Sequence, residues 1–389
     1  MVNNLQPLFK KGIFLFFVIL MATGCSGEVA LERPDDLADV EPLYLHDGRT
    51  ASAPEVSLTP VAEFGEVGDV LYRTISAAAV TKSGRVFLAD QNEGVVHAYE
   101  PGGTYIRQVG GKGEGPGEFR TTTNIHVHGD ELIVLDVNTR RLSFFDAETL
   151  EFDRAVALEG SGETSISSLP IGVRPVDEEK LVVLTSRFTM SDGKASTTLM
   201  PVVIDREGTV LNRPEIDVPA TEMLMLQSDN SINMFSLPYN ERGILGLLGR
   251  DRFFTANSAR FYLRIYDLEG TFQYAIYYHM PTIPVAFDRL MSDYEPHVRQ
   301  SAREAGVPEQ MPVLSTITAD EEGRFWVGLP NEEDAEQTYW ILSTEGELLA
   351  TATLDENDRI YAFQDGHVYL LTLTDEGLPL VVKNRYQLP

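Results

Sequence analysis

The sequence predicts an all-β protein, a six-bladed β-propeller made of four-stranded antiparallel blades. Three observations predict it. One strand pattern recurs six times, its regular copies lie about 45 residues apart, and a spare strand precedes the first copy whereas the last copy lacks one. A period of roughly 40–50 residues with four strands in each unit is typical of a propeller blade.

Each copy is a turn of Gly or acidic residues followed by a strand rich in β-branched and aromatic residues. Gly84 precedes the strand that ends at Asp90, and Gly129 precedes the strand that ends at Asp136, 45 positions further on. The six copies occupy residues 83–90, 129–136, 178–184, 249–255, 322–328 and 365–371.

A second turn recurs between the third and fourth strands of the unit. It reads Asp-x-x-Gly at Asp205 and Asp267 and Ser-x-x-Gly at Ser343, and its glycine supplies the positive φ that a tight hairpin needs. The sixth unit lacks its outer strand, while residues 56–64 form an unpartnered strand before the first unit. We therefore expect the N-terminal strand to pair with the last blade and close the ring, which removes exposed strand edges.

Two longer gaps between copies predict insertions near residues 205–236 and 281–312. The first holds a methionine-rich stretch at 220–236, and flexible methionine side chains suit adaptable binding surfaces. The alternative is that these methionines fill gaps in the core. The candidate partner-binding residues in this stretch are Met223, Met225, Met234 and Phe235.

The second insertion contains the one helix that the sequence predicts, over residues 286–305. Phe287, Leu290 and Met291 follow helical spacing, and Pro296 should break or kink the helix. Such a helix would cap one mouth of the propeller, pack on its side or cover a binding site. Leu290 and Met291 are the further partner-binding candidates.

The first 25 residues have the pattern of an export signal. Two lysines precede an apolar run over 13–22, which is shorter than the roughly 20 residues of a membrane-spanning helix. The run ends in Ala22-Thr23-Gly24-Cys25, which resembles the lipobox of bacterial lipoproteins, and Cys25 is the only cysteine of the chain. The resemblance implies that Cys25 is the lipid attachment site. The alternative is an ordinary secretory signal whose cysteine is incidental.

The remaining domain boundaries follow from composition. Residues 26–52 are polar and acidic without sustained periodicity, so we expect an acidic flexible tether between the lipid and a propeller over 53–389. The resemblance to bacterial lipoproteins implies that Ser26, directly after the cysteine, favours the outer membrane over the inner one. The formal net charge of -28 and the pI of about 4.5 argue against a nucleic-acid partner. We expect a monomer in the bacterial cell envelope, facing the periplasm or the outside.

A glycine-rich segment carries a second resemblance. Residues 108–119 read Gln-Val-Gly-Gly-Lys-Gly-Glu-Gly-Pro-Gly-Glu-Phe, and this run resembles the inter-blade linker of NHL-repeat propellers. The resemblance covers about residues 75–158 and is nearest to six-bladed propeller lipoproteins of bacteria, whose members mostly lack an assigned activity. The run does not open a helix and lacks the closing Lys-Ser/Thr of a phosphate-binding loop.

Candidate metal ligands are few. His126 and His128 alternate along one predicted strand, so both imidazoles lie on one face, but a site needs three or four ligands. Some six-bladed propellers are lactonases that hold a divalent cation, such as Ca²⁺, in the central channel by Glu, Asn and Asp. Asn124, Asn257 and Asp320 lie where blade-top loops could project into such a channel, but no motif of that family connects them. The alternative for the two histidines is that they are polar strand residues that face solvent or a neighbouring blade.

Asp90 and Asp136 end equivalent strands of the first two blades. Their repetition predicts a structural role, in which each carboxylate accepts hydrogen bonds from the amides of the following loop.

These observations support two hypotheses about function. The first is a cell-envelope-anchored module that binds a protein, a small molecule or a carbohydrate. The second is a metal-dependent hydrolase, lactonase or lyase that uses the central channel. Fold alone does not decide between them.

Overall fold

The structure of this chain is a computed structural model, and it describes residues 31–65, 72–158, 166–191, 194–228, 231–236, 239–292, 294–330 and 336–388. The chain divides into residues 1–32 and 33–389, and the architecture described below belongs to the second unit. Cys25 and the predicted export signal lie outside the described residues.

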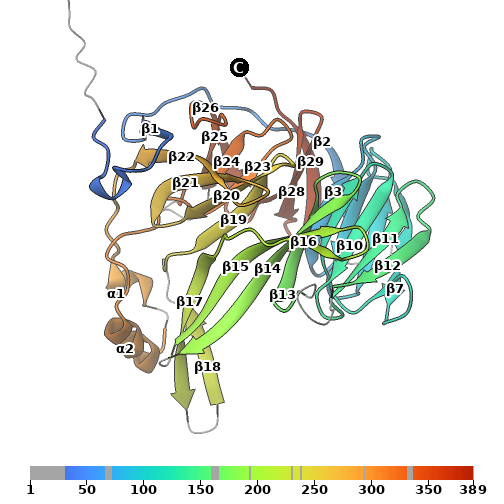
Figure 1. Cartoon of the computed structure of the whole chain (residues 1–389), viewed down its shortest axis with the longest axis horizontal. Helices are drawn as coiled ribbons and strands as arrows, with labels where there is room; N and C mark the ends of the chain where they lie inside the picture. Colours follow the sequence, from blue (N-terminus) through green and yellow to red (C-terminus); the bar gives the residue numbers. More distant parts are fainter. Residues whose placement is uncertain are drawn as a thin grey trace, which may run out of the picture. The chain divides into compact units, whose positions relative to one another are not determined.

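Six antiparallel sheets succeed one another along the chain and form the blades of a six-bladed β-propeller, as the sequence predicts (Figure 1). The strands of blades 1 and 2 are β3 (Ile75–Val80), β4 (Val86–Asp90), β5 (Val95–Tyr99), β6 (Tyr105–Val109), β9 (Thr122–His128), β10 (Glu131–Asp136), β11 (Arg141–Asp146) and β12 (Phe152–Ala157). Those of blades 3 and 4 are β13 (Leu169–Pro175), β14 (Lys180–Ser191), β15 (Lys194–Asp205), β16 (Val210–Asn212), β19 (Gly243–Leu248), β20 (Arg252–Asn257), β21 (Arg260–Asp267) and β22 (Phe272–His279). Those of blades 5 and 6 are β23 (Thr316–Ala319), β24 (Phe325–Gly328), β25 (Glu336–Leu342), β26 (Leu348–Asp355), β27 (Arg359–Gln364), β28 (His367–Leu373), β29 (Pro379–Arg385) and β2 (Thr59–Phe64).

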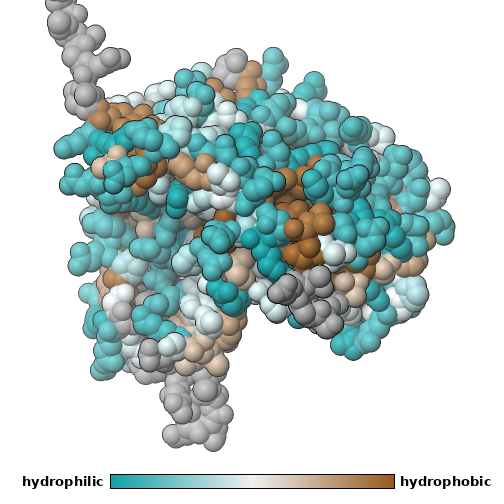
Figure 2. Space-filling model, viewed as in Figure 1, coloured by the Kyte–Doolittle hydropathy of each residue, from teal (hydrophilic) through white to brown (hydrophobic). Residues whose placement is uncertain are grey.

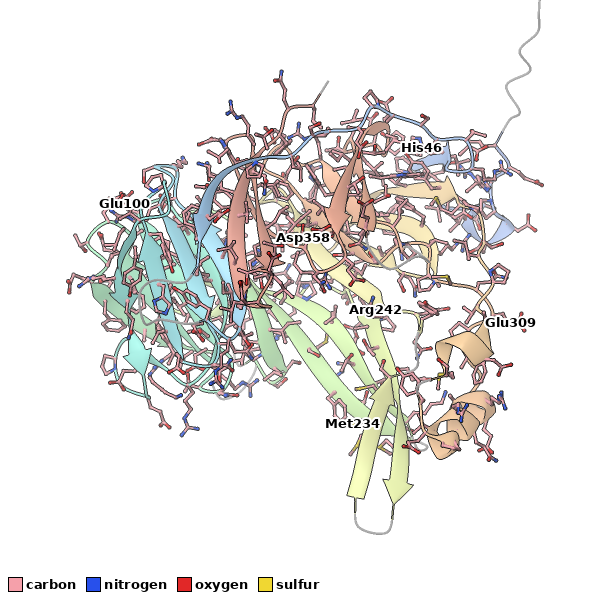
Figure 3. All side chains as sticks on the ribbon, turned by 180° about the vertical axis from the view of Figure 1, so that it is seen from behind. His46, Glu100, Met234, Arg242, Glu309 and Asp358 are labelled. Carbon is pink, nitrogen blue, oxygen red and sulfur yellow. The ribbon has the colours of Figure 1, made fainter. Side chains whose placement is uncertain are left out.

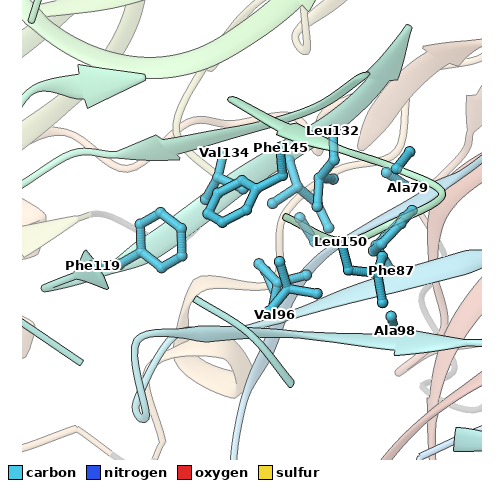
Figure 4. Packing of buried hydrophobic residues seen from close by; sticks show 14 residues of the cluster. Ala79, Phe87, Val96, Ala98, Phe119, Leu132, Val134, Phe145 and Leu150 are labelled. Atoms are coloured by element: carbon cyan, nitrogen blue, oxygen red, sulfur yellow. The ribbon is translucent and has the colours of Figure 1, made fainter. Parts of the chain in front are cut away.

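The core lies between neighbouring blades. Each sheet is covered on both faces, so its middle strands are largely apolar, and every residue of β4 is buried, including Asp90 at its end. Between blades 1 and 2, side chains such as Phe87 and Val96 pack against Leu132 and Phe145 (Figure 4). Phe119, the last residue of the glycine-rich linker, is fully buried in the same cluster. The linker thus fastens the two blades it joins.

The recurring Asp-x-x-Gly turns have one common geometry. The Asp205 carboxylate accepts hydrogen bonds from the amides of Glu207 at 3.0 Å and Thr209 at 2.7 Å, and Gly208 has a φ of +87°. Asp267 and Ser343 begin equivalent turns with the same acceptor pattern. The side-chain acceptor and the glycine together produce the turn.

The ring is closed as the sequence predicts. β2 pairs with β29 in antiparallel register, with Phe64 opposite Val381, and supplies the outer strand of blade 6. Phe64 is fully buried, and its ring centroid lies 5.9 Å from that of Tyr99 in blade 1 and 6.1 Å from that of Tyr369 in blade 6. One residue from the N-terminal side therefore packs across the joint between the first and last blades.

Residues 33–52, which we predicted to belong to a flexible tether, are instead part of the propeller unit. β1 (Leu43–Asp47) pairs in parallel with β22 and adds a fifth strand to blade 4, and His46 stacks on Tyr278 at 4.7 Å. The prediction was wrong because the short apolar run Leu43-Tyr44-Leu45 lies within an otherwise acidic stretch. These residues pair with the outer strand of blade 4. Their pairing depends on a strand more than 200 positions away, so the local sequence does not indicate it.

The same segment continues along blade 5 before it reaches blade 6. The amide of Thr351 in β26 donates to the carbonyl of Pro54 at 2.9 Å, and the amide of Val56 donates back to Thr351 at 2.7 Å. Residues 43–64, here called the N-terminal belt, therefore follow the outer strands of blades 4, 5 and 6 in turn. Figure 3 shows the belt, in blue, running from the region of His46 along the outside of the ring.

The first insertion forms an extended arm on blade 3. Here β14 and β15 continue beyond the blade, and β17 (Val218–Ser228) pairs with β15 while β18 (Ser231–Ser236) pairs with β17. These strands project from the ring (Figure 1). We call residues 186–191, 194–199, 218–228 and 231–236 the arm.

The second insertion contains two short helices, α1 (Phe287–Leu290) and α2 (Pro296–Ala305). Pro296 begins α2, because proline lacks an amide hydrogen and suits the first turn of a helix. The predicted interruption at this residue is therefore confirmed. Two backbone hydrogen bonds, from Val285 to Glu309 at 3.0 Å and from Met311 to Ile283 at 2.8 Å, close the insertion at its base. The described residues also include η1 (Asp35–Leu37), β7 (Gly111–Lys112) and β8 (Glu118–Phe119).

The packing of Phe64 gives a test of ring closure. We expect Phe64→Ala to lower the free energy of unfolding by about 3–5 kcal/mol, because it removes a large buried ring from the joint between blades. Val61→Ala, at a position of β2 that is 49% exposed, is the matched control and should cost under about 1 kcal/mol. Urea unfolding followed by tryptophan fluorescence measures both, and equal losses would show that the joint does not depend on Phe64.

Candidate functional site

The inner strands of the six blades surround a central cavity of about 490 Å³, within the size range of small-molecule sites. Each inner strand contributes residues near its C-terminal end, so the cavity lies at the end of the channel where the inner strands turn into the second strands. The lining includes the following polar residues from five blades: His126, Arg174, Arg250, Thr318, Asp320, Glu321, Tyr361 and Gln364.

Blades 2, 3 and 4 give the cavity a basic wall. Arg174 comes from β13, Arg250 from the turn after β19, and His126 from β9. Arg174 donates from Nη1 to the carbonyl of Val173 at 3.0 Å and to Oδ1 of Asn124 at 3.5 Å. Among the described residues, no carboxylate lies within salt-bridge distance of the Arg174 guanidinium. Burial lowers the pKa of Arg174 to about 10, which still leaves it charged at pH 7.

Arg250 belongs to a chain of polar contacts at the edge of this wall. Its Nη1 lies 3.3 Å from Nδ1 of His128, and Nε2 of His128 lies 3.3 Å from a carboxylate oxygen of Glu178. His128 is buried; burial lowers its pKa, and the charge of Arg250 lowers it further. Glu178 thus partly offsets the Arg250 charge but does not reach the cavity lining.

His126 stands in a strongly positive environment. Its pKa lies well below the usual range, first because burial disfavours the charged imidazolium and then because Arg174 and Arg250 are close by. At neutral pH its ring is therefore uncharged, with one nitrogen able to donate a hydrogen bond and one able to accept.

Acidic side chains line the opposite side, from blade 5. The carboxylate of Asp320 forms an ion pair with Arg324 at 2.6 Å and accepts from Nε1 of Trp326 at 3.2 Å, so its charge is locally balanced. Glu321 is exposed and accepts a hydrogen bond from the amide of Asp365 at 2.7 Å. In a ring of six, blade 5 faces blade 2. The cavity is consequently polarised, with cationic groups on one side and Glu321 on the other.

The five predicted metal ligands do not gather at one point. His126 and Asp320 line the cavity, and His128 lies beside it. Asn124 accepts a hydrogen bond from the amide of Val173 at 2.9 Å and so joins blades 2 and 3. Asn257 stabilises the turn after β20, where its side-chain Oδ1 accepts a hydrogen bond from the backbone amide of Ala259 at 2.8 Å.

No group of three His, Cys, Asp or Glu side chains that could hold a metal ion occurs among the described residues. Ca²⁺ requires six to eight oxygen ligands. The basic wall does not fit this requirement, so the expectation of a channel cation receives no support from the geometry.

The structural interpretation of the repeated aspartates is confirmed. The Asp90 carboxylate accepts hydrogen bonds from the amides of Asn92 and Glu93, both at 3.0 Å. The Asp136 carboxylate accepts from the amides of Asn138 and Thr139 at 3.0 and 3.2 Å. Both side chains are buried and hold the loop between the second and third strands.

Arg174 and Arg250 were not among the residues predicted from the sequence. One signal was available for Arg174, because it is a single charged residue inside the apolar strand segment Ile171–Val176. A charge in such a strand either pairs or faces a cavity. No comparable signal marks Arg250, which sits in a polar turn like many others.

The candidate partner-binding residues fall into two groups. On the arm, Met234 is 55% exposed and Met223 and Met225 are half-buried; Met190 and Phe188, from the paired hairpin, add further exposed apolar surface. The arm therefore presents methionine to solvent, on a molecule whose visible face is largely hydrophilic (Figure 2).

The helical insertion differs. Met291 is fully buried in a small cluster with Ala302 and, at its edge, Phe287, so its role is packing and it is not available to a partner. Leu290 ends α1, and Phe235 lies on β18 opposite Leu224.

Comparisons with known proteins agree with this architecture. Residues 68–244, which span blades 1 to 3 and the arm, match the model of the DUF5128 family, described as a 6-bladed beta-propeller. No curated protein sequence matches the chain. None of the helices in the described ranges is long and apolar enough to cross a membrane.

Several solved structures are similar to the chain. One is a protein from Bacteroides fragilis described as exported, with 12% identity, coverage of 89% of this chain and 99% of that chain, and a TM-score of 0.51. A member of the DUF4221 family from Bacteroides vulgatus has 8% identity, covers 87% and 100%, and has a TM-score of 0.45. BamB from Moraxella catarrhalis has 12% identity, covers 86% and 95%, and has a TM-score of 0.37. At these identities the likeness concerns the fold alone.

The lowered pKa of His126 predicts a pH dependence of stability. In the unfolded chain His126 takes up a proton as the pH falls through about 6.5. In the folded chain it stays neutral over this range, so the unfolded state is favoured and the free energy of unfolding decreases as the pH falls below about 6.5. We expect wild type to lose more stability than His126→Gln between pH 7 and pH 5 in urea unfolding. His367→Gln, on β28 and outside the cavity lining, should behave as wild type. Parallel losses in wild type and His126→Gln would contradict the assignment.

Proposed function

We propose that this chain is a non-catalytic binding protein of the bacterial cell envelope whose propeller holds a small organic anion in its central cavity. The observation that carries the proposal is the basic wall. In a chain with a formal net charge of -28, the central cavity brings together Arg174, Arg250 and His126 on adjacent blades.

The chemistry of Arg174 supports an anionic ligand. A guanidinium presents a planar set of donors that matches carboxylate and phosphate groups, and desolvated charges are normally paired. The Nη1 atom of Arg174 donates to one backbone carbonyl oxygen and one side-chain amide oxygen. The N–H groups of its other two nitrogens are left to donate to a ligand. A carboxylate or phosphate on the ligand would supply the missing negative charge, and the neutral ring of His126 would add one hydrogen bond.

The opposite wall narrows the ligand class. Glu321 on blade 5 would repel a second anionic group at the far side of the cavity. The cavity of about 490 Å³ therefore favours a small molecule with a single anionic end and a neutral or cationic far end. Tyr361 contributes little to recognition through its hydroxyl, because that group donates to the carbonyl of Ile75 at 2.6 Å.

The location in the envelope is also part of the proposal. The apolar run over 13–22, the sole cysteine at position 25 and Ser26 support export, lipidation at Cys25 and the outer membrane. A strongly acidic surface suits a monomer that stays soluble above the membrane to which its lipid is attached.

The ligand site can be tested with the purified propeller and a panel of probes. Isothermal titration with acetate, glutamate, inorganic phosphate and glycerol 3-phosphate should detect at least one saturable ligand, and Arg174→Gln should weaken it by about tenfold or more, since a charge-assisted hydrogen bond contributes roughly 1.5–3 kcal/mol. Arg385→Gln, an exposed position on β29, is the charge-matched control. Equal binding by both variants, or no binding of any probe, would refute the anion site.

The lipid anchor has its own test. Expressed with its signal in a bacterial host, wild type should enter the detergent phase in a Triton X-114 partition, and its N-terminal peptide should carry the mass of attached acyl chains. Cys25→Ser should remain in the aqueous phase, because it lacks the thiol that forms the thioether. Partition of the variant into detergent would show that Cys25 is not the anchor.

A further inference from the structure

Four methionines of the arm lie on one face of its sheet. Met225 of β17 is directly opposite Met234 of β18, so their side chains project to the same side. Met223 shares that side, because it lies two positions before Met225 on the same strand. Met190 of β14 shares it too, since Met190 and Met223 are both paired with Ala195 of β15. We call this side of the arm the methionine face.

The charged side chains of the arm lie on the opposite face. Arg187, Lys194 and Glu222 occupy the alternate positions of β14, β15 and β17. Lys194 forms an ion pair with Glu222 at 2.6 Å, and Arg187 forms one with Asp217 at 3.0 Å. The charges of that face therefore offset one another. The methionine face has no titratable side chain among the arm residues that the structure describes.

Three of these methionines are near enough for their sulfur atoms to meet. The Cβ atoms of directly opposite residues such as Met225 and Met234 are about 4.5–5.5 Å apart, and the diagonal from Met223 to Met234 is about 7–8 Å. Met223 and Met225 are separated by two residues of strand, about 7 Å. A methionine sulfur lies two bonds beyond Cβ on an unbranched, flexible side chain, so the three sulfurs can reach a common point.

Met190 stands apart from this group of three. The strand β15 separates Met190 from Met223, and two strand spacings amount to about 9.5 Å. Ala195 lies between them, and its methyl side chain offers no ligand atom. Met190 is 65% exposed. It therefore shares the face and the solvent with the three methionines but not their proximity.

The three methionines are open to a solute and are held on paired strands. Met234 is 55% exposed, and Met223 and Met225 are half-buried. Figure 3 shows Met234 on the part of the arm that projects from the ring. Met291, by contrast, is fully buried in its own cluster. Packing accounts for Met291, but it leaves the sulfur atoms of the arm unexplained.

The chemistry of the thioether limits the ligand. It is a neutral, polarisable sulfur donor, and soft donors of this kind select Cu(I). Ca²⁺ and Mg²⁺ take oxygen ligands, and Zn²⁺ is bound by thiolate, imidazole and carboxylate groups. A face that combines three thioethers with no titratable side chain therefore discriminates against the harder metal ions.

We propose that Met223, Met225 and Met234 form a binding site for Cu(I), in which each residue supplies one thioether sulfur as a metal ligand. The site goes beyond the proposed function, because it lies on the arm and shares no residue with the central cavity.

The test measures Cu(I) affinity without oxygen, by competition with bicinchoninate. Every sample is the exported chain with Cys25→Ser, because a free thiolate would itself bind Cu(I). This parent should withdraw one equivalent of Cu(I) from the chelator. Met234→Leu should weaken binding by about tenfold or more, a loss of at least ~1.4 kcal/mol. Leucine has nearly the volume of methionine, so this exposed substitution preserves the fold.

Met190→Leu is the matched control, because it removes an exposed thioether from the same face. It should bind Cu(I) as the parent does, whereas Met223→Leu and Met225→Leu should resemble Met234→Leu. Equal weakening by Met190→Leu and Met234→Leu would show that Cu(I) meets any exposed methionine, and it would overturn the proposal.

A second measurement distinguishes thioethers from histidines. A thioether has no proton to lose, so the affinity for Cu(I) should stay constant between about pH 8 and pH 6, whereas a histidine site weakens as its imidazole takes up a proton near pH 6.5. X-ray absorption at the copper edge should show sulfur neighbours. The proposal fails if the affinity falls with pH, if nitrogen replaces sulfur around copper, if the parent binds no Cu(I), or if Zn²⁺ at equal concentration displaces it.

Discussion

The closure of the ring by β2 is the constraint on which the rest of this structure depends. Each blade buries both of its faces only if it has a neighbour on each side, so a ring with one joint missing would expose two apolar sheets. β2 crosses that joint, because it is hydrogen-bonded to blade 6 while Phe64 packs against Tyr99 of blade 1. The N-terminal belt extends the same connection along blades 5 and 4. Together with the contact between the inner strands β27 and β3, in which the Tyr361 hydroxyl donates to the carbonyl of Ile75, this segment closes the circle of inner strands that surrounds the central cavity.

Arginine side chains reinforce contacts between neighbouring blades. Arg85 of blade 1 donates to the carbonyls of Ala147 and Glu148 at 2.6 and 2.8 Å, and Arg141 of blade 2 donates to the carbonyl of Glu114 in the preceding linker at 2.9 Å. A guanidinium offers five donors in a fixed plane and can satisfy several carbonyls that loops leave unpaired. Lysine cannot do this with comparable geometry, which gives a physical reason why arginine greatly exceeds lysine here.

The charge of the central cavity is opposite to that of the whole molecule. The cavity collects arginine and histidine inside an acidic protein, where the low surrounding dielectric strengthens their attraction for an anion. Burying these cationic groups costs folding free energy unless a ligand supplies the opposite charge, and such local costs often mark binding sites.

The sequence by itself determined the repeat, the number of blades, the closing strand and the role of Asp90 and Asp136. All of these depend on short-range chemistry, since turn acceptors, glycines and alternating apolar residues act within a few positions of the chain. Only the tertiary structure decided that residues 43–47 complete blade 4, that Met291 is buried while Met234 is exposed, and that Arg174 and Arg250 share a cavity. These outcomes depend on which residues meet across the ring, and residues far apart in the sequence leave no local pattern that records their meeting.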